Sequence, residues 1–411
     1  MKIIIIGTYI PRRCGIATFT NDLYKSLVTN SDETVHVLAI SDGKQMPYPM
    51  EVKRVIDQFN PADYLKSAEW INQHYDLCII QHEFGIFGGE SGVYINQLVE
   101  ALEIPLITNF HTILDHPTQQ QEINIVHLAK KSSQITVMSK KSTQILIDVY
   151  HLNPDKIVYI PHGVPEFSLS QFQAKEKLGL LNKKILLSFG FLGRGKGYET
   201  AIEAVSKIED TDFLYIILGT THPNVLKQEG EDYRDELIQH VEALQIKDKV
   251  KFINQFAQDD LLKTYLSACD MYVSPYPNAN QISSGTLSFA MGAGAAILST
   301  PYWYAVDLLS DGRGILFDFK DANALAKAIK ELLANPSLLA NYRKKAHDMG
   351  QTMTWKSLGL KHLDLSKKVV LDSSIVNSNP SQELLDLSWQ KKILKLNLNK
   401  SKDITTADPK V

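Results

Sequence analysis

Short apolar runs alternate with segments of helical periodicity along most of the chain, and this alternation restricts the fold more than any other feature. The first series contains KIIIIG, TVHVLAI, YDLCIIQ and PLITNF, with the helical pattern TFTNDLYKSLV after the first run. A second series begins at KILLSFG and continues through FLYIILG, VKFI, MYVS and AAILS. Such alternation builds parallel sheets with crossover helices. The sequence therefore predicts an α/β protein with two Rossmann-like domains that face each other across a cleft.

The segment IPHGVPEF, at residues 160–167, separates the two series. We therefore expect a first domain over residues 1–165 and a second domain over residues 166–355. A further helix is expected over residues 356–372, crossing back to the first domain. Residues 373–411 are rich in Ser, Asn, Lys and Asp, and this composition predicts a polar, partly disordered tail.

Charge and cysteine content exclude several classes of function. The chain has 43 Lys and Arg against 46 Asp and Glu, a formal net charge of -3, so nucleic acid is not an expected partner. Its cysteines, Cys14, Cys78 and Cys269, form no CxxC pair, so neither a disulfide framework nor a zinc site is expected. The apolar run near the N-terminus is too short for a signal peptide. We expect a cytoplasmic protein without a metal site.

Residues 271–306 contain no Asp, Glu, Lys, Arg or His. Within them, residues 287–305 are about long enough to cross a bilayer as a helix. Glycines and Pro301 interrupt this stretch, however, and no Lys/Arg cluster flanks it. We interpret the charge-free stretch as protein core or as the wall of a pocket.

Two glycine-containing loops follow predicted strands of the first domain. Gly15 precedes a helix and could bring backbone N–H groups to an anion, but a tight turn explains it equally well. The loop at residues 81–94 holds His82, Glu83 and Glu90. These side chains could bind sugar hydroxyls on the acceptor side, or they could cap the local backbone.

The second domain begins with the glycine-rich loop FGFLGRGKG. Arg194 and Lys196 place positive charge just before a helix, so we predict a diphosphate clamp, with a plain surface turn as the alternative. The glycine spacing is not that of a Walker P-loop. Farther on, SSGT at residues 283–286 is expected to begin a helix, with Ser283 or Ser284 as its N-cap.

Taken in this order, the Gly15 loop, NFHT, IPHGV, FGFLGRGKG, DMYVSPY, AMGAG and DGRGILF resemble the retaining glycosyltransferases of the GT-B fold, specifically glycosyltransferase family 4. The resemblance covers roughly residues 1–370. It implies transfer of a hexose, mannose or glucose, from a nucleoside diphosphate sugar to a saccharide or glycolipid acceptor with retention of configuration. The first domain would bind the acceptor and the second the donor, and no metal or other cofactor is expected.

The resemblance also implies roles for individual residues. His111, in NFHT, would orient the transferred sugar, while Arg194 and Lys196 would take the charge of the diphosphate. The residues expected to bind the donor are Gly15, Gln281, Ser283, Ser284, Gly285, Thr286, Phe289 and Asp307.

Several positions depart from the family pattern. Matching AMGAG places Gln281 and Phe289 where the family has two glutamates, one beside the transferred sugar and one at the nucleotide ribose. Phe289 cannot accept a hydrogen bond from ribose. Phe191 stands where an arginine is usual, and Asp307 where a glutamate is frequent. The aromatic run at residues 302–304 either packs as core or stacks on a sugar or base.

The missing acids keep two other functions open. One is a GT-B glycoside phosphorylase that uses a sugar 1-phosphate, and the other is a non-catalytic sugar-binding protein. A peripheral contact with a membrane also stays open, because many relatives act on lipid-linked acceptors.

Overall fold

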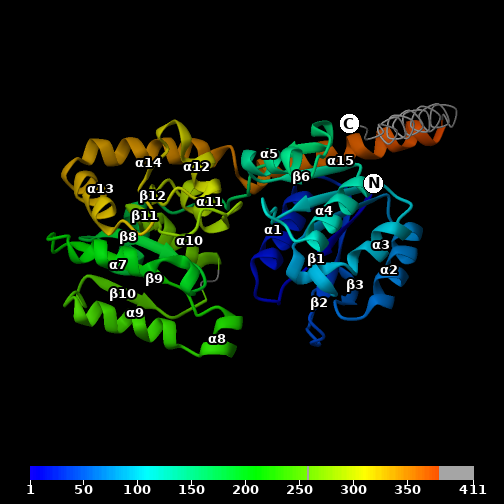
Figure 1. The fold of residues 1–411 in the computed structure, drawn as a ribbon. Helices are drawn as coiled ribbons and strands as arrows, with labels where there is room; N and C mark the ends of the chain where they lie inside the picture. The colour runs from blue at the N-terminus through cyan, green and yellow to red at the C-terminus, as the bar shows by residue number, and fades with distance from the viewer. Residues whose placement is uncertain (257–258, 379–411) are drawn as a thin grey trace, which may run out of the picture. The chain divides into compact units, whose positions relative to one another are not determined.

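The computed structural model of the protein describes residues 1–256 and 259–378. The first part of the chain forms a parallel sheet of seven strands in the order β3-β2-β1-β4-β5-β6-β7 (Figure 1). Its strands are β1 (Lys2–Gly7), β2 (Thr34–Ser41), β3 (Val52–Asp57), β4 (Leu77–His82), β5 (Leu106–Phe110), β6 (Gln134–Val137) and β7 (Ile157–Tyr159).

The helices of this first part connect successive strands of the sheet. They are α1 (Gly15–Asn30), α2 (Pro61–His74), α3 (Ile95–Ala101), α4 (Gln119–Lys131) and α5 (Lys140–Asp148), with short 3-10 turns η1 (Phe84–Ile86), η2 (Glu90–Gly92) and η3 (Pro154–Lys156). The continuous isoleucine run in β1 is fully buried, from Ile3 to Ile6. A central strand of a parallel sheet is covered on both faces, which explains an apolar run without alternation.

The second sheet has six parallel strands in the order β10-β9-β8-β11-β12-β13. These strands are β8 (Lys184–Phe189), β9 (Phe213–Leu218), β10 (Val250–Ile253), β11 (Met271–Ser274), β12 (Ala296–Ser299) and β13 (Gly314–Leu316). The surrounding elements are α6 (Gln171–Leu178), η4 (Arg194–Lys196), α7 (Tyr198–Ser206), α8 (Pro223–Glu229), α9 (Asp232–Ala243), α10 (Asp259–Ala268), α11 (Gly285–Gly292), α12 (Trp303–Leu309), η5 (Ser310–Gly312), α13 (Ala322–Ala334) and α14 (Pro336–Gln351).

Successive side chains of the second sheet enter two separate cores. Leu186 of β8 packs in one core with residues of α7, α9 and α13. Its neighbours Ile185 and Leu187 pack in the other core, with residues of α10, α11 and α12. Because strand side chains point to alternate faces, both faces of this sheet are buried. The predicted α/β fold with two parallel sheets is confirmed.

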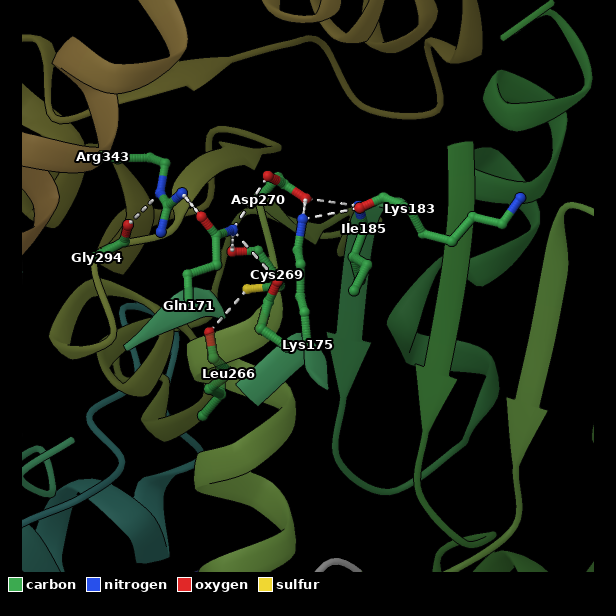
Figure 2. A network of polar contacts seen from close by, with 10 residues as sticks. Gln171, Lys175, Lys183, Ile185, Leu266, Cys269, Asp270, Gly294 and Arg343 are labelled. Carbon is green, nitrogen blue, oxygen red and sulfur yellow. Dashed lines mark hydrogen bonds and ion pairs between the residues drawn. The ribbon is translucent and has the colours of Figure 1, made fainter. Parts of the chain in front are cut away.

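A buried ion pair fixes the amino ends of strands β8 and β11. Asp270 Oδ2 accepts hydrogen bonds from Lys175 Nζ at 2.7 Å and from Ile185 N at 2.8 Å, and Oδ1 accepts from Gln171 Nε2 at 3.1 Å (Figure 2). Arg343 of α14 donates to the side chain of Gln171 and to Gly294 O. This network joins α6, α14 and the sheet through charged groups that all have partners.

The charge-free stretch at residues 271–306 supplies β11, α11, β12 and the first turn of α12. Leu287, Ala290 and Met291 of α11 are fully buried, and so is Leu298 of β12. No helix in the part of the chain that the structure describes is long and apolar enough to cross a membrane. The interpretation of this stretch as core is confirmed for these residues.

The last described helix is α15 (Trp355–Ser378). In its first turn the Trp355 carbonyl accepts a hydrogen bond from Ser26 Oγ, and the Lys356 carbonyl accepts one from Asn30 Nδ2 at 3.3 Å. Met1–His362, which include both sheets, form one compact unit, and a second unit begins at Leu363. The tail predicted from residue 373 is helical as far as Ser378, and residues 379–411 lie outside the described residues.

Candidate active site

The start of α11, which follows β11 of the second sheet, carries several hydroxyl side chains. Ser284 has an extended backbone, with φ at -151°, and its Oγ accepts a hydrogen bond from Leu287 N at 3.3 Å. Ser284, rather than Ser283, is therefore the N-cap. Thr286 Oγ1 lies 3.2 Å from Ser284 Oγ. The predicted helix start in SSGT is confirmed.

Lys196 reaches this helix start through a tyrosine. Lys196 Nζ donates to Tyr276 Oη at 3.1 Å and lies 4.3 Å from the centre of the tyrosine ring. Tyr276 Oη lies 3.2 Å from Thr286 Oγ1. Lys196, Tyr276, Ser284 and Thr286, which we call the Lys196 cluster, thus link the loops after β8 and β11 to the N-terminus of α11.

Burial of Tyr276 acts to raise its pKa, but the nearby Lys196 charge and hydrogen bonds from Thr286, Lys196 and Ser284 outweigh it, so the pKa is lowered. An ammonium and a helix N-terminus at one place favour a bound anion. The sequence interpretation missed Tyr276, although it lies two residues after β11 in the motif DMYVSPY.

The backbone of the glycine-rich loop is fixed by close contacts. Gly197 has φ at +69°, and a Cβ at this position would lie 2.1 Å from Pro275 O. Only glycine fits there. The contact places Lys196, the preceding residue, directly beside the loop that carries Tyr276.

Arg194 has a different environment from Lys196. Its guanidinium bonds to both Glu236 oxygens, at 2.7 and 2.8 Å, and to Glu229 at 3.1 Å, while the side chain is 51% exposed. These carboxylates raise the pKa of Arg194. No contact among the described residues joins Arg194 to the Lys196 cluster. Its predicted place in a diphosphate clamp stays a prediction, and the observed contacts do not favour it.

His111 follows β5 and is buried. Its Nε2 lies 2.8 Å from Gln81 Oε1, and its backbone carbonyl accepts a hydrogen bond from Ser283 Oγ at 3.1 Å. Burial, followed by the neighbouring His162 and His82, lowers the pKa of His111 to about 3. The structure therefore brings a neutral His111 to the residue before the N-cap of α11.

The remaining predicted donor residues lie in three different environments. Gly15 begins α1 after the N-cap Cys14, and a Cβ added to it would meet no atom within 4 Å. Gln281 is exposed, and its Nε2 donates to Ser283 O at 2.7 Å. Phe289 stacks on Phe189 with ring centres 6.3 Å apart, so it packs as part of an aromatic group. Gly15 leaves space open, as an anion site requires, whereas Phe289 serves packing.

Asp307 forms a hydrogen bond outside the Lys196 cluster. Its Oδ2 accepts a hydrogen bond from Lys141 N, at 3.0 Å, in the first turn of α5. A carboxylate at a helix N-terminus is a stabilising arrangement in itself. This hydrogen bond is sufficient to explain an acidic residue at position 307. Binding of the sugar nucleotide by Asp307 therefore stays a prediction.

The aromatic run before Asp307 is mostly core. Tyr302 and Tyr304 are buried, and their hydroxyls lie 3.0 Å from Ser274 Oγ and 2.6 Å from Ser288 Oγ. The half-buried Trp303 lies under the ammonium of Lys141, 5.4 Å from the ring centre. Of the two interpretations of this run, the structure supports packing for the tyrosines.

The three acceptor-side candidates differ in exposure. His82 is fully buried against Phe84, Phe87 and Phe110, and burial lowers its pKa to about 3. Burial raises the pKa of Glu83, which accepts a hydrogen bond from Thr112 Oγ1 and also bonds to backbone N–H groups of its own loop. Glu90 is exposed at the start of η2. For Glu83, the alternative of local backbone capping describes the structure.

Three half-buried rings follow adjacent strands of the second sheet. Phe191, His222 and Phe256 come after β8, β9 and β10, and Phe191 contacts both other rings, with centres 5.2 and 5.7 Å apart. The guanidinium of Arg13 lies 5.5 Å from the centre of the Phe256 ring. We call Phe191, His222 and Phe256 the aromatic platform. It was not predicted, because its members lie far apart in the sequence.

Residues 170–349 match the family described as glycosyl transferases group 1. The group 1 segment contains the second sheet, the Lys196 cluster and the aromatic platform, whereas His111 precedes it.

The chain is similar to mannosylfructose-phosphate synthase from Agrobacterium fabrum, with 23% identity over an alignment of 398 residues that covers 86% of this chain and 83% of that protein. Two solved structures share its fold over 90% of this chain and 100% of theirs. They are HepE from Anabaena in complex with UDP, with a TM-score of 0.72 at 18% identity, and sucrose-phosphate synthase from Thermosynechococcus elongatus, with a TM-score of 0.73 at 17% identity. The expected GT-B fold is confirmed.

Proposed function

We propose that the protein is a retaining hexosyltransferase of glycosyltransferase family 4. It would move mannose or glucose from a nucleoside diphosphate sugar to a saccharide or glycolipid acceptor. The observation that carries the proposal is the Lys196 cluster, because an ammonium, hydroxyls and the N-terminus of α11 converge at one place in the group 1 segment.

In this reaction the bond between the anomeric carbon and the diphosphate oxygen breaks, and the oxygen leaves with the electron pair. The acceptor hydroxyl forms the new bond on the same face of the sugar, and its proton passes to the leaving phosphate. Lys196 would stabilise the negative charge that develops on that phosphate, and the backbone N–H groups that begin α11 would add to this effect. The neutral His111 would orient the sugar.

The aromatic platform supports a donor that carries a nucleobase. It lies at the carboxyl ends of three adjacent parallel strands, where α/β sheets bind ligands. A nucleobase stacks on aromatic rings, whereas inorganic phosphate, the substrate of a phosphorylase, has no ring that could stack there. The complex of the similar HepE structure with UDP agrees with this choice.

A thermal-shift series tests the proposed donor class. The purified protein is heated with UDP, GDP, ADP, inorganic phosphate or buffer alone. We expect one nucleoside diphosphate to raise Tm by several degrees, because a ligand that binds only the folded state stabilises it. A response to phosphate alone would favour the phosphorylase, and no response would favour a non-catalytic protein. Turnover of the matching sugar nucleotide, with analysis of the anomeric product, then tests transfer and retention.

The absence of a cofactor is part of the proposal, since Lys196 supplies positive charge where some transferases use a metal. A cytoplasmic location is also proposed, and cell fractionation would test it.

A further inference from the structure

Gln81 lies near the carboxyl end of β4, after four apolar residues of that strand. It is fully buried and pairs in register with Asn109 of β5, which is also buried. A Cβ at Gly7 of the neighbouring strand β1 would lie 3.1 Å from Gln81 Cβ, so glycine leaves room for the amide side chain. A buried amide without hydrogen bonds destabilises a fold, so the partners of Gln81 indicate its role.

The amide oxygen of Gln81 has two partners. It accepts a hydrogen bond from Asn109 Nδ2 at 3.0 Å, and it lies 2.8 Å from His111 Nε2. The other two atoms of the amide pair, Gln81 Nε2 and Asn109 Oδ1, have no partner in the part of the chain that the structure describes. The hydrogen bonds of this buried pair are therefore concentrated on the oxygen that faces His111.

The contact with Gln81 determines which nitrogen of His111 carries hydrogen. An amide oxygen can only accept a hydrogen bond, so the hydrogen is on Nε2. Nδ1 then keeps its lone pair, and none of the described residues bonds to it. Phe19 contacts the same ring edge to face, with centres 4.6 Å apart. One nitrogen of His111 is thus fixed, and the other is available as an acceptor.

The partner of His111 is an amide and not a carboxylate. Burial, followed by His162 and His82, lowers the pKa of His111, and no acidic group is among these influences. A carboxylate beside a histidine favours the charged ring, whereas an amide accepts a hydrogen bond without adding negative charge. Gln81 therefore orients the ring and leaves it neutral.

We propose that Gln81 is a positioning residue of the transfer reaction. Its amide oxygen selects the neutral form of His111 with hydrogen on Nε2, so that Nδ1 accepts a hydrogen bond from the transferred sugar. The inference rests on the proposed function, in which His111 orients that sugar. Gln81 acts through His111, from a buried position in the first sheet.

Nitrogen NMR of protein with isotope-labelled histidine tests the tautomer without any substrate. A ring nitrogen with hydrogen gives a different signal from one without, and His111→Asn identifies the signals of His111. In wild type at neutral pH we expect hydrogen on Nε2. Gln81→Met removes the acceptor at nearly constant length and should give a mixture of both tautomers. Gln81→Glu should keep hydrogen on Nε2, and its ring should gain a proton at higher pH than the wild-type ring.

Steady-state kinetics with the donor found by thermal shift tests the role in transfer. Gln81→Met should lower kcat/KM about three- to tenfold, the effect of one hydrogen bond, because part of the protein then carries hydrogen on Nδ1. Gln81→Glu, whose carboxylate can accept, should recover part of this loss. Gln134→Met is the matched control, since it makes the same substitution in β6 at a residue without a bond to His111. It should resemble wild type.

Each other result has a defined meaning. Hydrogen on Nδ1 in wild type, or an unchanged tautomer in Gln81→Met, overturns the proposal. So does wild-type kcat/KM of Gln81→Met, or an equal fall in Gln134→Met, which would indicate general damage to the sheet. If Gln81→Met does not fold, Gln81→Glu decides, because a ring that titrates as in wild type overturns the contact.

Failure of the proposed function gives a different pattern. Wild type would then transfer from no nucleotide sugar, while its NMR signals still show hydrogen on Nε2. The positioning role falls with the function in that case, although the contact between Gln81 and His111 is confirmed.

Discussion

Arg194 and Lys196, two cations in one short loop, have different partners in the structure. Arg194 pairs with Glu229 and Glu236, which lie 35 and 42 positions farther along the chain, whereas Lys196 bonds to Tyr276. The sequence predicts positive charge near a helix start, but it does not indicate which cation already has a carboxylate. The region of the candidate site was thus predictable from the sequence. The different partners of Lys196 and Arg194 within it were not.

Replacing Lys196 and replacing Arg194 should have unequal effects on turnover. Lys196→Ala is expected to lower kcat by more than about tenfold, because it removes the charge that we propose faces the leaving group. Arg194→Ala breaks exposed ion pairs and a contact with the Tyr233 ring, and it should change kcat by less than about threefold. Steady-state kinetics with the donor found by thermal shift measures both. Near-normal turnover of Lys196→Ala would rule out its role at the diphosphate.

His82 is expected to make stability fall in acid. Its pKa of about 3 lies below the ordinary value of 6.5, so below pH 6.5 the unfolded chain binds a proton that the folded chain does not. The folded state then loses up to about 1.4 kcal/mol per pH unit between pH 6.5 and 3 relative to a chain without this group. His82→Leu, which also removes two buried nitrogens without partners, should remove that loss.

Urea unfolding at pH 7 and pH 5 measures this effect. The free energy of unfolding of His82→Leu should fall less than that of wild type between the two pH values. His116→Leu is the matched control, since the His116 side chain is 92% exposed. Equal decreases in the free energy of unfolding for wild type and His82→Leu would show that His82 does not contribute to the loss of stability in acid.

At the scale of helices and strands, local pattern predicted much of the structure. The buried run KIIIIG became β1, and SSGT became the start of α11, because burial and capping depend on neighbouring residues. Contacts between distant residues were not predictable. Asp307 was expected at the donor, yet its partner is the first turn of α5, 166 positions away. The aromatic platform was missed for the same reason.

Gly197 and Gly195 form a matched pair for testing the glycine-rich loop. Gly197→Ala places a Cβ against Pro275 O on a backbone with positive φ, which costs about 1 to 3 kcal/mol of stability or shifts the loop. We expect lower Tm and lower turnover, because Lys196 moves with the loop. A Cβ at Gly195 meets no atom within 4 Å, so Gly195→Ala should resemble wild type. Equal turnover of the two variants would contradict this account of the loop.

The ion pair drawn in Figure 2 should be essential for the stability of the second sheet. Lys175→Met leaves Asp270 buried without its cation, and breaking such a pair costs about 3 to 5 kcal/mol. Lys183→Met, which removes a more exposed pair with Asp212, should cost at most about 1 kcal/mol. Chemical unfolding of both variants gives the comparison. A loss below about 1 kcal/mol for Lys175→Met would mean that Asp270 keeps enough hydrogen bonds by itself.

At the scale of the whole molecule, the candidate site draws on segments far apart in the chain. Ser283, beside α11, donates to the carbonyl of His111, which follows β5 in the first sheet. Only residues 170–349 match the group 1 family, so His111 and His162 lie outside the matched segment. The two-sheet fold was predictable from the repeated alternation, whereas these contacts depend on how distant segments meet.

Turnover is expected to continue in EDTA. In the proposed reaction, Lys196 and the N-terminus of α11 would supply positive potential at the leaving diphosphate, so turnover should not depend on an added metal ion. The measurement compares initial rates with EDTA, without EDTA, and with added Mg²⁺. A strong loss in EDTA that Mg²⁺ restores would contradict charge stabilisation by Lys196 alone.

The positions of the three cysteines suit the protein to site-selective labelling. Cys78 and Cys269 are completely buried, and burial raises the pKa of both thiols, that of Cys269 to about 12. Cys14 is partly exposed and caps the helix that begins at Gly15. A maleimide fluorophore should therefore attach to Cys14 in the wild-type protein, without engineered residues. Its emission would then report on ligands that arrive at the Gly15 loop.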